Sequence, residues 1–350
     1  MPLTYKAAGV DVVAGNQAVR TIAQLVKKTF TPNVLTGIGL FGSLFDVSDL
    51  KRYRHPVLVQ SIDGVGTKMA VAKLTKRFDV VGHDIVAHGC NDVLCQGAKP
   101  LNFLDYIASA QLDQAIVSQL ITGMADECAQ YGIALVGGET AEMPGTYTAG
   151  EWDIAGVMLG VVEKDAIRDG SSIAADDIVI GLSSTGLHTN GYSLARKVFF
   201  DHLRLTVNDT VSELAGQTIG QALMQPHYNY TTTVLPLLDR YTISGIAHIT
   251  GGGLVENIPR ILPAGLDCQI TKGSWPSVPI FQAIQQHGAV PEQDMYVTFN
   301  MGIGLVLVVR PNDVAAVIES LAQANSIGSN GITATVIGKI IPGQQQVCFV

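Results

Sequence analysis

The segment DGVGTK, residues 63–68, places a carboxylate, two glycines and a lysine within six positions. It is not a Walker A loop, because that motif has four residues between its first glycine and a terminal Gly-Lys-Ser/Thr. The glycines allow the backbone to approach a ligand closely, and Lys68 could bind a phosphate. Asp63 would repel that phosphate unless a cation lay between them, and Mg²⁺ is bound by carboxylates together with phosphate oxygens. The segment therefore indicates either a phosphate site with Mg²⁺ or only an Asp-Gly turn after a strand.

Two further acids and a histidine share one face of a helix that the sequence predicts over residues 80–96. Asp84, His88 and Asp92 are spaced four residues apart, so their side chains lie on the same side of this helix. Acids on a helix with few other charges cost stability unless a partner satisfies them. A hydrogen-bonded network or a metal site would do so, and His88 by itself is more typical of a structural histidine.

A third acidic segment, LVGGETAEMPG, follows a predicted buried strand at residues 133–136. We expect its two glycines to turn the chain at the carboxyl end of this strand, where open α/β sheets bind ligands. Glu139 could then complete an oxygen ligand set with Asp63 and Asp92, and such a set suits Mg²⁺ better than zinc. The alternative is an ordinary acidic loop.

Two glycine-rich turns in the second half of the chain are typical of anion sites. The first, SSTGLHTNG, begins at Ser183 and precedes a predicted helix, whose N-terminus would attract a phosphate. His188 in this turn could donate to a phosphate or move a proton near neutral pH. The second, TGGG at residues 250–253, follows His248 and repeats the pattern. A capped helix with a surface histidine is the alternative for the first turn.

The elements that must position these residues alternate between strands and helices. In the first half, helices are predicted over residues 15–29, 80–96 and 113–131, and strands over 56–62, 101–108, 133–136 and 154–162. A break at residues 163–177 precedes predicted strands over 178–182, 302–309 and 334–340, and helices over 192–200, from about 255, and over 312–324. We therefore predict a mixed α+β and α/β fold with two domains, residues 1–165 and 166–350.

Composition restricts the classes of function. The formal net charge of −8 argues against nucleic-acid binding, and no apolar run approaches the ~20 residues that span a bilayer. The N-terminus has no signal-peptide pattern, and five cysteines without a C-x-x-C pair fit a reducing compartment. We expect a cytoplasmic protein with no nucleic-acid or membrane partner. Only 15% of the residues are charged, which suggests that a second copy of the chain covers part of the surface.

Eight motifs follow one another along the chain: YKAAGVD, DGVGTK, the Asn91-Asp92 pair, FLDY, GGETAEMPG, GLHTNGYSLAR, HITGGGLVENIPR and TFNMGIG. Together they closely resemble the phosphoribosylformylglycinamidine cyclo-ligase family, whose members are also called aminoimidazole ribonucleotide synthetases. Any one motif is weak, whereas eight in register are specific. The match runs from Tyr5 to about Gly304, which is most of the chain.

The resemblance implies an ATP-dependent ligase of de novo purine biosynthesis. Such an enzyme cyclises formylglycinamidine ribonucleotide to aminoimidazole ribonucleotide and releases ADP and phosphate. The formyl oxygen would be phosphorylated, and the amidine nitrogen would then attack the same carbon. The resemblance further implies a homodimer whose N-terminal domains, each a mixed sheet with helices, pair into a β-barrel. The C-terminal domain, a sheet covered by helices, would complete the substrate cleft.

The resemblance also assigns roles to individual residues. Mg²⁺ would be bound by Asp63, Asp92 and Glu139. ATP would be bound by Gly64, Gly66, Thr67, Lys68, Asp92, Gly137, Gly138 and Glu139. The nucleotide substrate would be bound by Gly37, Gly39, Gly42, Ser43, His188, Thr189, Asn190, Thr250, Gly251, Gly252 and Gly253. The candidate catalytic residues are His188, Lys68 and Asp63. The family pattern is more apolar near position 88, so His88 is not among the predicted site residues.

Relatives with the same ATP-binding architecture are the nearest alternatives. Selenophosphate synthetase would need a reactive cysteine near an N-terminal glycine-rich loop, and no cysteine precedes Cys90. The hydrogenase-maturation relative needs a cysteine as its last residue, whereas two residues follow Cys348. Thiamine-phosphate kinase lacks the combination of GGETAEMPG and GLHTNGYSLAR. A non-catalytic nucleotide sensor with the same fold is the alternative from another class.

Overall fold

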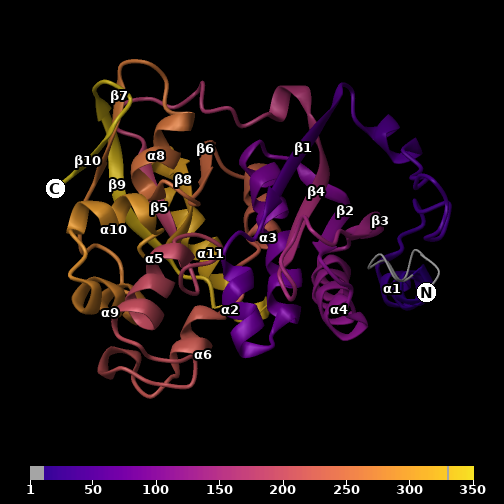
Figure 1. Ribbon diagram of the computed structural model, residues 1–350. Helices are drawn as coiled ribbons and strands as arrows, with labels where there is room; N and C mark the ends of the chain where they lie inside the picture. The colour runs from indigo at the N-terminus through magenta and orange to yellow at the C-terminus, as the bar shows by residue number, and fades with distance from the viewer. Residues whose placement is uncertain (1–11, 329–330) are drawn as a thin grey trace. The chain divides into compact units, whose positions relative to one another are not determined.

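The computed structural model describes residues 12–328 and 331–350 (Figure 1). The motif YKAAGVD, at residues 5–11, lies outside the described residues. The described residues up to Val93, with Pro100–Lys164, form one compact unit. Leu94–Lys99 and Asp165–Val350 form the other. Each unit contains a sheet and helices, so the predicted two-domain α/β class is confirmed.

The first unit is built on a four-stranded mixed sheet with the strand order β1-β4-β2-β3. Its strands are β1 (Pro56–Gly64), β2 (Lys99–Ser109), β3 (Ala134–Glu142) and β4 (Trp152–Glu163). β1 and β4 are antiparallel, whereas β2 and β3 are parallel. β1 and β3 therefore lie at opposite edges of the sheet.

The helices of the first unit include two that cross at very short distance. The α-helices are α1 (Val12–Val26), α2 (Lys68–Thr75), α3 (Phe78–Cys95) and α4 (Gln114–Gln130), with 3₁₀ turns at Lys27–Thr29 and Ser48–Arg52. A further 3₁₀ turn, Lys164–Ala166, spans the point in the sequence where the first unit ends. A Cβ on Gly82 of α3 would lie 2.1 Å from the Leu120 carbonyl oxygen, and one on Gly123 of α4 would lie 1.9 Å from that of Asp79. Only glycine at these two positions lets α3 and α4 pack so closely.

β1 separates its side chains between two different environments. Ser61 faces α3, because its hydroxyl donates to Asp92 (2.8 Å). Leu58 and Ile62 point to the opposite face and are 51% and 71% exposed. Val157 on β4 is the strand partner of Ile62, so apolar side chains of both strands share this face.

β3 is longer than the sequence predicted. We expected the strand to end at Val136 and its glycines to begin a loop, but the strand continues in parallel with β2 as far as Glu142. Neither Gly137 nor Gly138 has a positive φ, so neither makes a turn. Gly138 is instead required by packing, since a Cβ there would lie 2.4 Å from a carboxyl oxygen of Asp105.

The second unit is built on a six-stranded sheet with the order β10-β7-β9-β5-β8-β6. The strands are β5 (Ile178–Ser183), β6 (Ile243–His248), β7 (Leu266–Ile270), β8 (Ile303–Val309), β9 (Ala334–Pro342) and β10 (Val347–Phe349). The β10–β7 pair is parallel, and the other pairs are antiparallel.

Helices cover both faces of this sheet. They are α5 (Tyr192–Arg196), α6 (Ile219–Leu223), α7 (Thr231–Leu238), α8 (Gly253–Asn257), α9 (Pro279–Gly288), α10 (Glu292–Thr298) and α11 (Val314–Gly328). Ile180 of β5 packs in one core with residues of α7 and α11. The next residue along the strand, Val179, packs in the other core with residues of α8 and α10. The helix predicted over residues 192–200 is interrupted, because α5 passes into a π-helical turn at Lys197–His202.

Shorter helical turns connect the elements of the second unit. They are 3₁₀ turns at Ser212–Leu214, Ile258–Ile261 and Pro311–Asp313. In the part of the chain that the structure describes, no helix combines the length and apolar character needed to cross a membrane.

Candidate active site

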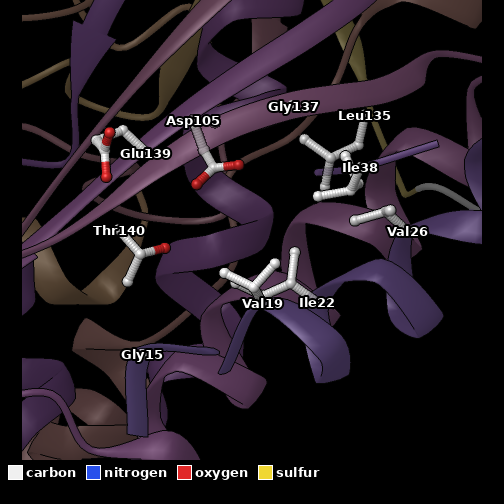
Figure 2. Close-up of a pocket in the computed structure, with 11 residues that line it drawn as sticks. Gly15, Val19, Ile22, Val26, Ile38, Asp105, Leu135, Gly137, Glu139 and Thr140 are labelled. Carbon is white, nitrogen blue, oxygen red and sulfur yellow. The ribbon is translucent and has the colours of Figure 1, made fainter. Parts of the chain in front are cut away.

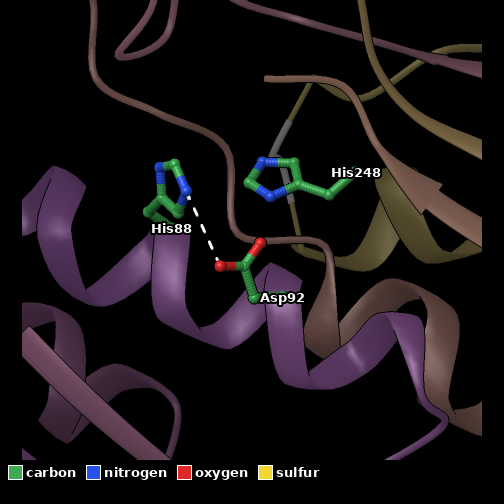
Figure 3. A group of neighbouring side chains, drawn as sticks. All are labelled: His88, Asp92 and His248. Atoms are coloured by element: carbon green, nitrogen blue, oxygen red, sulfur yellow. Dashed lines mark ion pairs between the residues drawn. The ribbon is translucent and has the colours of Figure 1, made fainter. Parts of the chain in front are cut away.

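A carboxylate cluster forms where β1 meets α3. Asp63 lies near the end of β1. His88 and Asp92 lie one turn apart on α3, as Figure 3 shows. Nε2 of His88 is 2.9 Å from Oδ2 of Asp63 and 3.7 Å from Oδ2 of Asp92. Two acids that are 29 residues apart in the sequence thus share one imidazole.

The imidazole of His88 changes the electrostatics of this cluster. Burial acts to raise the pKa of Asp63, but the hydrogen bond and charge of His88 and the Gly64 N–H together outweigh it and lower this pKa below its ordinary value. Burial acts to lower the pKa of His88, and its contacts with Asp63 and Asp92 reverse the effect and raise it. The sequence analysis left His88 out of the site, although its spacing from Asp92 was the signal that could have found it.

Glu139 does not join this cluster. The carboxylate oxygens of Asp63, Asp92 and Glu139, all in the described part of the chain, do not lie together within 4.8 Å. The strand order explains the separation, because β4 and β2 lie between β1, which carries Asp63, and β3, which carries Glu139. The predicted set of three carboxylates is therefore not assembled within one chain.

Lys68, the last residue of the DGVGTK segment, belongs to a second cluster of charges. It is the first residue of α2, and its ammonium group is 2.5 Å from Oδ2 of Asp84 on α3. Both side chains are 0% exposed. His83 contacts the same acid, with Nδ1 3.4 Å from Oδ1 of Asp84, and its Nε2 is 2.9 Å from Glu127. In this structure the charge of Lys68 is thus held by a buried carboxylate.

Burial and pairing have opposite effects on these groups. Burial lowers the pKa of Lys68 below its ordinary value, although Asp84 opposes the change. Burial acts to raise the pKa of Asp84, but Lys68 and His83 bring it below its ordinary value. Burial would also lower the pKa of His83, but its hydrogen bonds to Asp84 and Glu127 raise it to about 10. His83 is therefore protonated at neutral pH and lies against the carboxylate of Asp84.

A pocket of about 180 Å³ lies between α1 and β3 (Figure 2). Its walls are mainly aliphatic, and the lining residues are Gly15, Val19, Ile22, Val26, Ile38, Asp105, Leu135, Gly137, Gly138, Glu139 and Thr140. Three of the predicted ATP-binding residues, Gly137, Gly138 and Glu139, are thus found together. Burial raises the pKa of Asp105 to about 7, and nearby Glu139 contributes in the same direction. Asp105 belongs to the FLDY motif, but the sequence analysis gave it no role.

The glycine-rich segment before β1 lies at the surface. Its four predicted substrate residues, Gly37, Gly39, Gly42 and Ser43, are exposed. Phe41 in the same segment is fully exposed. Ile38 contributes to the pocket between α1 and β3, so this segment reaches the predicted ATP-binding residues.

The two glycine-rich turns of the second unit do come together. Asn190 follows β5 and Gly251 follows β6, and a Cβ on Gly251 would lie only 3.2 Å from Oδ1 of Asn190. His188 is buried and has a φ of +57°, which residues with a side chain rarely adopt. The alternative of a surface histidine is therefore wrong. Thr189 accepts a hydrogen bond from Asn190 (3.3 Å).

Glycines in these motifs are required by packing as well as by turns. Gly253 has a φ of +59°, and a Cβ there would lie 2.1 Å from the Tyr296 carbonyl oxygen. A Cβ on Gly304, in the TFNMGIG motif, would lie 2.0 Å from the hydroxyl of Tyr230 and 2.5 Å from Cε1 of His188. Gly304 thus makes room for the two rings beside it.

Aromatic residues that the sequence analysis missed surround His188. The ring of His227 stacks on it at 3.9 Å, and the ring of Tyr228 meets it edge-on at 6.2 Å. Tyr230 donates a hydrogen bond to the Ser183 carbonyl oxygen (2.8 Å). The segment QPHYNY, with three rings in four residues, was the signal that could have found them.

Family models match most of the chain. The model described as "AIR synthase related protein, N-terminal domain" matches residues 50–162. The model described as "AIR synthase related protein, C-terminal domain" matches residues 174–350. Together with the two units and their glycine-rich turns, these matches define the class as AIR synthase-related proteins.

Relatives named phosphoribosylformylglycinamidine cyclo-ligase are similar over nearly the whole chain. The one from Geotalea daltonii is 51% identical over 338 residues, which are 97% of this chain and 95% of the relative. The one from Trichlorobacter lovleyi is 50% identical over 337 residues, which are 96% and 94% of the two chains. The chain belongs to the phosphoribosylformylglycinamidine cyclo-ligase family.

Solved structures of more distant proteins have the same fold. Thiamine-monophosphate kinase from Stenotrophomonas maltophilia matches with a TM-score of 0.68 and 18% identity, over 93% of this chain and 94% of that one. HypE from E. coli matches with a TM-score of 0.67 and 17% identity, over 95% and 93%. A hydrogenase maturation protein HypE in complex with ATP matches with a TM-score of 0.64 and 16% identity, over 96% and 91%. At these identities the likeness concerns the fold alone.

Proposed function

We propose that this protein catalyses the ATP-dependent cyclisation of formylglycinamidine ribonucleotide to aminoimidazole ribonucleotide, a step of purine biosynthesis. The observation that carries the proposal is the 50–51% identity to cyclo-ligases across at least 94% of both chains. The alternatives with the same fold are disfavoured, because the kinase and the HypE proteins are only 16–18% identical.

The reaction proceeds in two steps, phosphorylation and ring closure. The formyl oxygen of the substrate attacks the γ-phosphorus of ATP, so that a new O–P bond forms while the bond to ADP breaks. The amidine nitrogen then attacks the same carbon. A C–N bond forms, the C–O bond to phosphate breaks, and the nitrogen releases a proton. Positioning and neutralisation of charge supply most of the catalysis in such phosphoryl transfers.

Asp63 and Asp92 are suited to hold Mg²⁺. Their carboxylates lie together around His88, and Mg²⁺ in nucleotide sites is bound by one or two carboxylates with phosphate oxygens and water. The bound ion would neutralise the phosphate charge. His88 keeps the two carboxylates close together, and the Gly64 N–H donates to Oδ1 of Asp63 (2.6 Å).

The aliphatic pocket between α1 and β3 is suited to the base and ribose of ATP. Gly137, Gly138 and Glu139 line it, whereas Asp63 lies on β1 at the opposite edge of the same sheet, and Asp92 of α3 accepts a hydrogen bond from Ser61 of β1. One chain thus offers two separate halves of a nucleotide site. We propose that a homodimer joins the pocket of one chain to the carboxylates of the other.

The outward face of the sheet is suited to form that dimer. Leu58 and Ile62 are exposed there beside Val157. Exposed apolar side chains on a strand do not stabilise a single chain, and such a patch is typical of an interaction surface. Pairing of two such faces would give the barrel implied by the resemblance. Ile62→Asp should convert the dimer into a monomer in light scattering. A wild-type protein that is monomeric at micromolar concentration would contradict this part of the proposal.

In the second unit, His188, Thr189 and Asn190 with Thr250–Gly253 are suited to bind the substrate's ribose phosphate and amidine. The support is their proximity, together with the strained backbone of His188 at φ +57°. Lys68 would mainly neutralise the charge of Asp84, because its ammonium group is buried against that carboxylate. Direct contact of Lys68 with a phosphate stays a prediction.

A coupled assay tests the function. Phosphate release from ATP is measured with formylglycinamidine ribonucleotide present and absent, and aminoimidazole ribonucleotide is quantified in the same samples. We expect release only with substrate, and one phosphate for each product molecule. ATP binding without turnover would favour a nucleotide sensor and overturn the proposal.

A further inference from the structure

His227 links two other histidines of the second unit. Its ring stacks on that of His188, with centroids 3.9 Å apart and planes at 26°. Its Nε2 lies 3.2 Å from Nε2 of His248. All three side chains are buried. They come from the turn after β5, the segment between α6 and α7, and the end of β6, so only the fold brings them together.

The hydrogen bonds determine which ring nitrogens carry protons. Nε2 of His188 accepts from the N–H groups of Thr185 (3.3 Å) and Tyr228 (3.5 Å). Because a backbone N–H can only donate, this nitrogen is unprotonated and the proton of His188 lies on Nδ1. Nδ1 of His227 is 2.9 Å from the Tyr228 carbonyl oxygen, which can only accept. The proton of His227 therefore also lies on Nδ1.

These two assignments determine which nitrogen donates in the contact between His227 and His248. In neutral His227, Nε2 is the unprotonated nitrogen and accepts a hydrogen bond from Nε2 of His248. A chain of hydrogen bonds thus leads from His248 through His227 to the Tyr228 carbonyl oxygen. It holds the proton of His248 on Nε2.

We propose that His227 is a positioning residue for the cyclisation: it fixes the ring plane of His188 and the tautomer of His248 without touching the substrate. This inference rests on the proposed function, in which the turns that carry His188 and follow His248 bind the substrate. Those turns meet where Gly251 approaches Asn190.

His227 also helps to hold the backbone conformation of His188. A left-handed φ is unfavourable for a residue with a side chain, so contacts must hold His188 in this conformation. The stacked ring of His227 supplies one such contact, and the two N–H donors supply others.

Two substitutions distinguish the ring contact of His227 with His188 from its hydrogen bond with His248. His227→Phe keeps an aromatic ring on His188 but can form neither hydrogen bond. His227→Gln keeps an acceptor for His248 but loses the stacked ring. Because one variant loses the hydrogen bonds and the other loses the stacked ring, we expect kcat to fall about three- to tenfold in each, with an unchanged KM for ATP. His287→Phe is the matched control, because His287 lies in the same unit and pairs with Glu213 instead.

The tautomers are measured in the free full-length protein by long-range ¹H–¹⁵N correlation. We expect protons on Nδ1 of His188, on Nδ1 of His227 and on Nε2 of His248 in the wild type. In His227→Phe, His248 should lose its single tautomer, whereas in His227→Gln and His287→Phe it should keep it. These signals do not depend on turnover, so they test His227 even if the wild type fails to cyclise the substrate.

Two results would overturn the proposal. One is a wild-type kcat in both His227 variants. The other is an unchanged tautomer of His248 in His227→Phe. If His227→Phe does not fold, His227→Gln decides: a lowered kcat with the tautomer of His248 retained supports the proposal, and an unchanged kcat overturns it.

Discussion

Replacement of Lys68 by methionine distinguishes a structural charge from a phosphate ligand. The ammonium group of Lys68 and the carboxylate of Asp84 are 2.5 Å apart and 0% exposed. Removing one member of a buried ion pair costs about 3–5 kcal/mol, because the other charge is left without compensation. His83 still contacts Asp84 at 3.4 Å and is protonated at neutral pH, so we expect the lower end, about 3 kcal/mol.

The two tryptophans allow the first unit to be observed by itself. Trp152 lies in β4 of the first unit, and Trp275 lies in the second. In a Trp275→Phe background, urea unfolding followed by fluorescence therefore reports on the first unit. Two-state analysis of the whole chain would not be valid for a protein of two units.

Matched variants complete the experiment. Lys73→Met changes an exposed lysine on the same helix, and we expect it to cost less than about 0.5 kcal/mol. The double variant Lys68→Met/Asp84→Leu should be more stable than Lys68→Met, because no unpaired charge is then buried at this position. If Lys68→Met costs no more than Lys73→Met and instead raises the KM for ATP, Lys68 is a phosphate ligand and the reasoning is refuted.

Three further predictions concern single side chains. The pKa of His83 is raised from 6.5 to about 10, so its contribution to stability is complete below pH 6.5 and is lost as the pH rises through 10. His83→Gln should therefore flatten the fall in the free energy of unfolding between pH 7 and 9, and an equal fall in both proteins would contradict this. The pKa of Asp105 is raised from 3.8 to about 7, so its neutral form is favoured and stability declines as the pH rises through 7. The free energy of unfolding of Asp105→Asn, measured with urea, should therefore rise relative to that of the metal-free wild type between pH 5.5 and 8. A difference between the two proteins that does not change with pH would contradict this. Asp92→Asn should fold normally but lose at least about 100-fold in turnover, whereas near-normal turnover would exclude Asp92 as a metal ligand.

Long elements with clear periodicity could be predicted from the sequence. The helix predicted over residues 113–131 is confirmed as α4, which spans Gln114–Gln130 with Asp113 as its N-cap. The strand predicted over 154–162 is confirmed as β4, Trp152–Glu163. Short helices such as α6 and α10, with five and seven residues, were missed, because so few residues show no helical period.

The candidate site could be predicted in part. The proximity of Asp63 and Asp92 could be predicted, because each residue lies on an element that the local sequence pattern indicates clearly. The separation of Glu139 from them depends on the strand order β1-β4-β2-β3, which no local pattern encodes. His227 was missed for a similar reason, since its neighbours His188 and His248 are distant in the sequence.

Transfer of the formyl oxygen to phosphate is the event that the account depends on. It can be followed with a substrate that carries ¹⁸O in the formyl group, in single-turnover reactions with ATP. We predict that the released phosphate contains the ¹⁸O atom and that aminoimidazole ribonucleotide forms in equal amount. Unlabelled phosphate, or release of phosphate without the cyclised product, would contradict the account.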